Sequence, residues 1–341
     1  MGREREITGP VELCDARGRL NPDARGWSRT PQLRANLRGA RGRKKRWDYW
    51  CVQTPEVIVA LVYADIDYAG LAGCWVLDVA GGRPVKVDAL APFGRGFALP
   101  EQVCTGTAEV STKALRMAIT ETPTETRLRA VAPSTERGRV EVELAVEKPA
   151  GHESLNVVIP WSDARFQFTS KQNTRPARGA VRVGDRRWAI GDGAEAWAVQ
   201  DLGRGIWPYA NRWNWAAASG RATDGRLVGL QFGGKWTEGT GYTENALCLD
   251  GRLTKISEEL EWRYDWEHPL RPWRVRSRGS SQVDVTLTPT FDRYESTNLA
   301  LLKMEVHQCF GTWSGAVIGD DGRAVALEGI RGFAEEARNR W

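Results

Sequence analysis

The chain has 341 residues, a formal net charge of +5 and 41% hydrophobic residues, enough apolar material for one large domain or two ordinary ones. No apolar run reaches the roughly 18 to 20 residues of a membrane-spanning helix, and the opening stretch MGREREITGP lacks the apolar core of a secretory signal. We therefore expect no transmembrane segment and a cytoplasmic location.

The first distinctive segment is basic. Between Arg34 and Arg46, in RANLRGARGRKKR, seven of thirteen residues are lysine or arginine. Such a run is typical of a solvated loop, of a site for an anionic ligand or lipid head group, or of a nucleic-acid contact. The run holds no aromatic ring before Trp47, and no nucleic-acid-binding motif accompanies it. We expect no nucleic-acid partner and retain a transient membrane-surface contact through Arg34 to Arg46.

Strand patterns follow along most of the chain. VIVALVYADI (57–66) is β-branched and apolar, typical of a strand buried on both faces, whereas VEVELAVE (140–147) and VDVTLTPTF (283–291) alternate with period two. Asp-Gly pairs at 224–225, 250–251 and 321–322 predict hairpin turns. The best helix candidate is FAEEARNRW, Phe333 to Trp341.

These patterns predict an all-β protein with two consecutive antiparallel barrels or sandwiches and a short C-terminal helix. A polar segment rich in proline and glycine, EKPAGHES (147–154), follows an alternating strand. We accordingly expect an N-terminal half, 1–155, and a C-terminal half, 156–341, while two halves closing into one continuous structure is an equal alternative.

Sixteen tryptophans are about four times the number that average composition gives. Trp75 and Trp188 lie in strand-like runs and are interpreted as core. The segment DLGRGIWPYANRWNWAAASG (201–220) differs, because its rings stand beside glycine, proline, asparagine and arginine. Trp213 and Trp215 are two positions apart, as are Trp207 and Tyr209, so each pair shares one face of a strand. Such rings build either a core layer or the wall of a ligand cavity.

Two polar segments flank these rings. TSKQNTRPARG (169–179) places Lys171, Asn173 and Arg175 at alternating positions, so that one face would present all three. GGKWTEGTGYTENAL (233–247) adds Trp236 and Tyr242. We predict that these polar and aromatic residues join the ring-rich segment in a binding site, with turn chemistry and solvated charge as the alternative.

Asp201, Glu238, Glu244 and Asp265 are the candidate carboxylates. A carboxyl group among rings would hold its proton near neutral pH and serve as a donor. Asp201 stands three residues from Arg204, however, and a structural salt bridge between them is the expected arrangement. Asp201 and Glu244 are the catalytic candidates.

Metal and cofactor sites are not expected. The six cysteines are dispersed without a C-x-x-C pair, and the three histidines have no ligand spacing, so a reducing compartment and buried thiols account for them. Nucleophile-elbow, phosphate-loop, zinc-peptidase and dinucleotide motifs are all missing from the sequence.

Several long motifs resemble the family called domain of unknown function 2804. They are GRKKRWDYW (42–50), KQNTRPARG (171–179), the ring-rich segment 201–220, YTENALCLDGRLTKI (242–256) and PWRVRS (272–277), and the resemblance extends from LCDARGRLN (13–21) to the closing EEARNRW. The chain is also remotely similar in architecture to lipocalin-like carotenoid hydratases, tocopherol cyclases and fungal survival-factor proteins. That likeness implies two lipocalin-like barrels in which an acid protonates an isoprenoid double bond and rings shield the carbocation.

Three hypotheses follow. The first is a binder of a lipid or isoprenoid in a barrel cavity lined by Trp207, Tyr209, Trp213, Trp215 and Trp236, with no cofactor. The second is a cofactor-free hydratase or cyclase in which Asp201 or Glu244 donates the proton. The third is an interaction protein that uses its basic run and keeps its tryptophans as core. We expect a hydrophobic small-molecule ligand.

Overall fold

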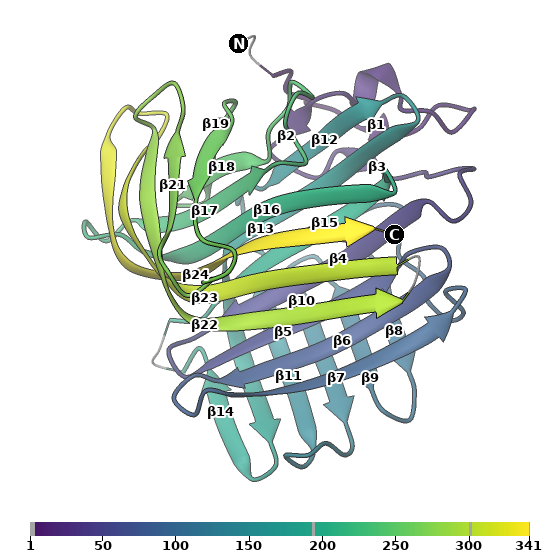
Figure 1. Ribbon diagram of the computed structural model, residues 1–341, viewed down its shortest axis with the longest axis vertical. Coiled ribbons are helices and arrows are strands. Elements are labelled where there is room, and N and C mark those ends of the chain that lie inside the picture. Colours follow the sequence, from purple (N-terminus) through teal and green to yellow (C-terminus); the bar gives the residue numbers. More distant parts are fainter. Residues whose placement is uncertain (1–3, 193–194, 300–301, 341) are drawn as a thin grey trace.

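A computed structural model describes residues 4–192, 195–299 and 302–340 (Figure 1). This part of the chain is built from β-strands, and its helical content is a single 3-10 turn, η1 (Pro22–Ala24). It therefore contains no helix with the length and apolar character needed to cross a bilayer. The all-β prediction is confirmed.

The first sheet is antiparallel and takes its strands from residues 27 to 206. Its strand order is β7 (Arg83–Pro92), β6 (Ala69–Asp78), β5 (Val57–Asp65), β4 (Lys44–Gln53), β15 (Trp197–Ile206), β13 (Arg165–Val183), β11 (Val140–Glu147), β10 (Glu125–Ala132), β9 (Arg116–Glu121) and β8 (Thr107–Ser111). In addition, β12 (Leu155–Ser162) and β14 (Arg186–Ile190) pair with β13, and β2 (Trp27–Ser28) pairs with β12. A separate short parallel pair joins β1 (Val11–Glu12) to β3 (Leu33–Arg34).

The second sheet is also antiparallel and begins after residue 206. Its strand order is β19 (Arg252–Ile256), β18 (Asn245–Leu249), β17 (Leu227–Gly234), β16 (Ala210–Arg221), β24 (Ala324–Arg340), β23 (Leu302–Ile318), β22 (Val283–Leu299), β21 (Trp273–Ser277) and β20 (Leu260–Arg263). The Asp-Gly pairs 224–225, 250–251 and 321–322 lie at the predicted hairpin turns, where the three glycines have φ of 86°, 79° and 72°. Only glycine adopts such angles without strain.

Each sheet curls around its own apolar core and packs its other face against its neighbour. Residues of β5 and β10, far apart in the strand order, meet in one buried cluster of the first sheet, as Val59 and Leu128 do. Because side chains alternate along a strand, the remaining positions face the second sheet, where Cys51 shares a cluster with Ala217 and Phe333. Two curled antiparallel sheets, packed face to face, thus confirm the predicted architecture (Figure 1).

The predicted C-terminal helix is wrong. Phe333 to Arg340 continue strand β24, which is paired on both sides, with β16 and with β23. The local helix-forming composition is overridden because each backbone group finds a partner in a neighbouring strand, and because Phe333 and Ala337 then face the first sheet. Trp341, the last residue of the predicted helix, lies outside the described residues.

The chain passes from the first sheet to the second between Ile206 and Ala210. This crossover lies inside the ring-rich segment, so that segment belongs to both sheets. The division into halves at residues 155 and 156 concerns folding units and stays a prediction.

Candidate functional site

A buried group of three charges lies between the two sheets. Lys171 on β13 and Asp201 on β15 are paired positions of the first sheet, and Glu244 precedes β18 of the second. The Lys171 ammonium lies 2.7 Å from Asp201 Oδ1 and 2.8 Å from Glu244 Oε1. Lys171 is 4% exposed and Glu244 is 2% exposed, so the group is shielded from water and screening by salt is weak. The structure thereby brings together both predicted acids and one predicted binding residue.

Tryptophan side chains hold both carboxylates of this group. The Trp47 indole N–H donates to Asp201 Oδ2 at 3.0 Å, and the Trp236 N–H donates to Glu244 Oε2 at 3.1 Å. Burial raises the pKa of Glu244, although Lys171 acts in the opposite direction. Burial alone would lower the pKa of Lys171, but the two carboxylates outweigh it and the net pKa is raised. The lysine therefore stays charged.

The predicted salt bridge between Asp201 and Arg204 is absent, since Arg204 pairs instead with Asp48 at 2.9 Å. The two residues are three apart on strand β15, and odd spacing places side chains on opposite faces of a strand. Asp201 faces the second sheet, while Arg204 lies on the face that curls around the core of the first. Asp201 is therefore paired with the ammonium group of Lys171 and not with a guanidinium group.

Five tryptophans form a continuous cluster beside the charged group. The rings of Trp207 and Trp236 stack at 5.6 Å with an interplanar angle of 10°. Trp161 lies 5.1 Å from Trp207 and 5.8 Å from Trp236, whereas Trp47 and Trp213 lie 5.6 and 5.8 Å from Trp207. The chain positions them from both sheets and from the crossover. We call these five residues the indole cluster, and its rings are in contact with one another.

The remaining predicted rings occupy different places. Trp215 lies in the adjacent part of the layer, where it packs against Phe333 at 4.7 Å and where the Lys171 ammonium lies 4.4 Å from its ring centroid. Tyr242 is half-buried against the indole cluster. Tyr209, by contrast, is 42% exposed and lies under the Arg43 guanidinium at 5.5 Å, on the rim of the crossover.

Lys171, Asn173 and Arg175 do not share one face, contrary to the prediction. The pairing of β13 with β15 shifts register between Gln172 and Arg175, and Thr174 has a φ of 55°. A bulge of this kind turns the following side chains to the other face. Asn173 remains on the side of the second sheet, where its amide donates to the Leu230 carbonyl at 2.6 Å.

Arg175, beyond the bulge, lies in the interior of the first sheet. Its guanidinium donates to the Val146 carbonyl at 3.3 Å and lies 5.8 Å from the ring of Trp50. Burial lowers its pKa to about 10. Both Asn173 and Arg175 therefore hold strands together in this structure.

Glu335 on β24 is the acid that sequence reasoning missed. Its Oε1 accepts the indole N–H of Trp213 at 2.8 Å, and its Oε2 accepts the Gln308 amide at 2.9 Å. Burial raises its pKa to about 7, against the lowering effect of the Trp213 bond, and the charge of Asp201 adds to the rise. Because the sequence predicted a helix over Phe333–Trp341, Glu335 was not recognised as a buried acid. The period-two spacing of Phe333, Glu335 and Ala337 was the signal for a strand face.

The two other candidate carboxylates lie elsewhere. Glu238 is exposed and pairs with Arg278 at 3.3 Å. Asp265 organises an exposed loop, where it pairs with Arg271 at 2.8 Å and with His268. Neither residue contributes to the layer between the sheets.

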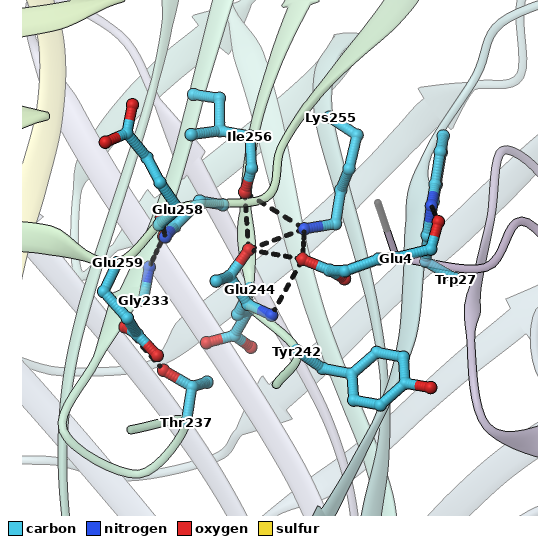
Figure 2. A network of polar contacts seen from close by, with 12 residues as sticks. Glu4, Trp27, Gly233, Thr237, Tyr242, Glu244, Lys255, Ile256, Glu258 and Glu259 are labelled. Atoms are coloured by element: carbon cyan, nitrogen blue, oxygen red, sulfur yellow. Dashed lines mark hydrogen bonds and ion pairs between the residues drawn. The ribbon is translucent and has the colours of Figure 1, made fainter. Parts of the chain in front are cut away.

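A second buried ion pair adjoins the site (Figure 2). Glu4 Oε1 lies 2.8 Å from the Lys255 ammonium and accepts the Thr243 N–H at 3.2 Å, next to Glu244 in the sequence. The Trp27 indole N–H donates to the Glu4 carbonyl at 3.3 Å. This network fastens the N-terminal segment to the second sheet beside Tyr242, as Figure 2 shows.

All six cysteines are free, and burial raises the pKa of Cys248, whose neighbour His152 has its pKa lowered to about 4 by burial. Both groups therefore stay neutral rather than forming a reactive thiolate pair. The described residues contain no cluster of three or more histidine, cysteine, aspartate or glutamate side chains arranged to hold a metal.

Structural comparison finds several solved proteins that are similar to this chain at low identity. An AttH protein of Nitrosomonas europaea is 13% identical, with 86% of this chain and 92% of that chain covered and a TM-score of 0.49. Kievitone hydratase of Nectria haematococca is 11% identical, with 88% and 89% covered and a TM-score of 0.47. CghA with Sch210972 is 10% identical, with 88% of each chain covered and a TM-score of 0.46.

Among curated proteins, sequence comparison finds no match. The family model described as Domain of unknown function (DUF2804) matches residues 4–341, which is nearly the whole chain. This confirms the resemblance carried by the motifs in the sequence: the chain belongs to the DUF2804 family.

Proposed function

We propose that this protein binds a hydrophobic small molecule, a lipid or an isoprenoid, against the indole cluster between its two sheets. Trp47, Trp161 and Trp213 of the cluster, together with the adjacent Tyr242, are only partly buried, so apolar rings reach solvent side by side. A group of partly buried aromatic rings is typical of a ligand-binding or docking surface.

The observation that carries this proposal is the direction of the indole N–H groups. Those of Trp47, Trp161 and Trp213 donate inward, to Asp201, to the Trp236 carbonyl and to Glu335. Trp207 donates to Gln167 at 2.7 Å in the same way. Because each polar hydrogen is used inside the protein, carbon atoms supply the ring surface that is left for a guest. Such a surface suits hydrocarbon.

The cluster is compact, so a guest would lie on its outer rings or separate them. Two hollows are defined elsewhere: a polar cleft of about 910 Å³ around Arg226 and Asp250, and a void of about 10 Å³ beside Arg293. Charged walls make the cleft unsuited to hydrocarbon. Of these three places, the ring surface therefore fits an apolar guest best.

Quenching of tryptophan emission by all-trans-retinol tests this proposal. The variant carrying Trp161→Ala and Tyr242→Ala removes two outer rings, and we expect its affinity to fall about tenfold, since aromatic anchors dominate apolar contacts. Tyr294→Ala is the control, because Tyr294 is 51% exposed on the second sheet away from the cluster. Unsaturable quenching of the parent protein, or equal affinity of both variants, would exclude the site.

Acid-catalysed hydration or cyclisation of an isoprenoid is the second candidate. Asp201 and Glu244 share the ammonium of Lys171, and burial lifts the pKa of the nearby Glu335 to about 7. In this scheme Glu335 gives its proton to a carbon–carbon double bond, and the rings of Trp213 and its neighbours stabilise the carbocation. Water then adds to the cation and returns a proton to the carboxylate, so that no cofactor is consumed.

Glu335→Gln separates the two candidates. Incubation of the parent protein with an isoprenoid alkene, followed by mass spectrometry, should yield a product heavier by one water or a cyclic isomer. The variant should keep retinol binding and lose product, because glutamine preserves the shape but cannot donate this proton. Retinol binding by the parent protein without any product identifies a binder.

A further inference from the structure

The end of strand β7 and the residue that follows it carry the two most exposed large hydrophobic residues of the described chain. Phe93 is 74% exposed and Leu90 is 68% exposed, and both lie at the end of the edge strand β7. Exposed edges are normally protected by charge rather than by apolar residues. An exposed leucine and an exposed phenylalanine this close in the chain therefore indicate a binding surface.

The loop holds Phe93 outward by backbone bonds. Phe93 has a φ of 58°, a conformation that non-glycine residues seldom adopt, and its N–H donates to the Tyr68 carbonyl at 2.8 Å. Four residues on, Phe97 is buried and its ring lies 4.8 Å from that of Tyr63. One phenylalanine thus anchors the loop while the other points to solvent.

The basic run adjoins this tip through the turn between β5 and β6. Asp67 in this turn accepts the Gly42 N–H, and the next residue, Tyr68, binds Phe93. Asp65 pairs with Arg46 at 3.0 Å, and Asp67 pairs with Lys44 at 3.3 Å. Only Lys44 and Arg46 of the basic run are therefore used to neutralise these two aspartates.

Positive charge remains in excess at this edge. Five exposed arginines form no ion pair within the described residues: Arg17, Arg19, Arg38, Arg41 and Arg95. They belong to three adjoining loops, since Gly18 packs against the Arg38 carbonyl and Gly94 packs against Asp65. Arginine retains its charge at any physiological pH and suits phosphate groups geometrically.

We propose that this edge docks on an anionic membrane surface. Phe93 and Leu90 enter the interfacial region of the bilayer, and the five arginines contact lipid phosphates around them. The two signals act together, because either an apolar prong or a polybasic patch alone gives weak, reversible binding. This inference uses no residue of the indole cluster and stands independently of the proposed ligand site.

The apolar prong favours a membrane over a nucleic acid. A duplex presents phosphates at its surface and offers no hydrocarbon in which leucine could be buried. Single-stranded recognition relies on several rings that stack on successive bases, whereas this tip projects one phenylalanine beside a leucine. The sequence-based expectation of no nucleic-acid partner is compatible with this assignment.

Co-sedimentation with lipid vesicles tests the proposal. We expect the full-length protein to bind phosphatidylcholine vesicles that contain about 30% phosphatidylglycerol, and to bind pure phosphatidylcholine vesicles at least about tenfold more weakly. The double variant Leu90→Thr and Phe93→Asn should lose about tenfold in partitioning, since asparagine tolerates the backbone angle of Phe93 while removing its ring. A variant with Arg38, Arg41 and Arg95 changed to glutamine should lose the preference for anionic lipid.

Leu270→Asn supplies the control, because Leu270 is an exposed leucine, 53% accessible, in a different loop. It should bind vesicles as the parent protein does, and thermal unfolding followed by circular dichroism should show that all variants fold. Absence of binding to the anionic vesicles, or unchanged binding of the Leu90 and Phe93 variant, overturns the proposal. Tighter binding to a DNA or RNA oligonucleotide than to the vesicles overturns it as well.

Discussion

Trp213 and Glu335 are joined by a hydrogen bond of 2.8 Å between strands β16 and β24. The indole N–H reaches the carboxyl group inside the layer between the sheets, where little water remains to stabilise a negative charge. The bond lowers the pKa of Glu335, but burial outweighs it, and the resulting pKa is about 7. A neutral carboxylic acid thereby persists among aromatic rings close to physiological pH.

Glu335→Gln should change how stability depends on pH. The pKa of Glu335 rises from 4.5 to about 7 on folding, so the folded protein binds this proton more tightly than the unfolded chain does. The parent protein should therefore lose up to about 3 kcal/mol relative to the glutamine variant as pH rises from about 4.5 to about 7. Urea unfolding of both proteins at pH 5 and pH 8 measures this difference. A pH-independent difference would contradict the assignment.

Lys171→Met should destabilise the fold by about 3 to 5 kcal/mol, because Asp201 and Glu244 would stay buried without their cation. A triple variant that adds Asp201→Asn and Glu244→Gln should recover much of this loss, since no uncompensated charge remains. Denaturant unfolding at pH 7 provides the comparison. If the single and triple variants were equally unstable, the packing of the lysine stem rather than its charge would be responsible.

A double-mutant cycle should confirm the partner of Arg204. Arg204→Met and Asp48→Asn should show a coupling of about 1 kcal/mol or more, because the two groups lie 2.9 Å apart. Arg204→Met and Asp201→Asn should be additive to within about 0.5 kcal/mol, since these side chains lie on opposite faces of β15. The reverse pattern would restore the salt bridge expected from the sequence.

Glu4→Ala should release the N-terminal segment from the second sheet. Lys255 would be left buried without its carboxylate, at a cost of about 3 kcal/mol. The Thr243 N–H, which donates to Glu4, should exchange faster with deuterium. Glu6→Ala is the control on the same segment, because its partner Arg29 is partly solvated and the expected change lies within about 0.5 kcal/mol. Equal exchange in the two variants would argue against this fastening.

Local patterns predicted the strands well. The run at 57–66 forms β5 (Val57–Asp65), and the alternating run at 140–147 forms β11 (Val140–Glu147), because period-two burial is a property of each strand alone. The proximity of Lys171, Asp201 and Glu244 could be predicted in part, because the segments that contain them are rich in aromatic rings and charged residues. Their pairing depends on which strands become neighbours, and that information is spread over the whole chain.

The errors have equally specific causes. Eight residues from Phe333 to Arg340 have helix-forming composition, yet neighbours on both sides of β24 impose a strand. Arg175 was assigned to the wrong face because one bulge near Thr174 inverts the alternation, and no residue type in that stretch announces a bulge. Glu335 was not predicted as a site residue because the sequence indicated a terminal helix there, and an acid on such a helix is interpreted as solvent-facing.

The order of strands in the second sheet has a consequence for how the molecule assembles. Its central neighbours, β16 and β24, are the first and the last of its strands along the chain, and Trp215 pairs with Glu335 across this seam. During synthesis, β16 must wait for more than a hundred later residues, from 222 to 323, before its partner exists. Contacts that close so long a loop form slowly. Glu335 and Trp213 therefore meet only at the end of folding, when the last strand of the sheet is in place.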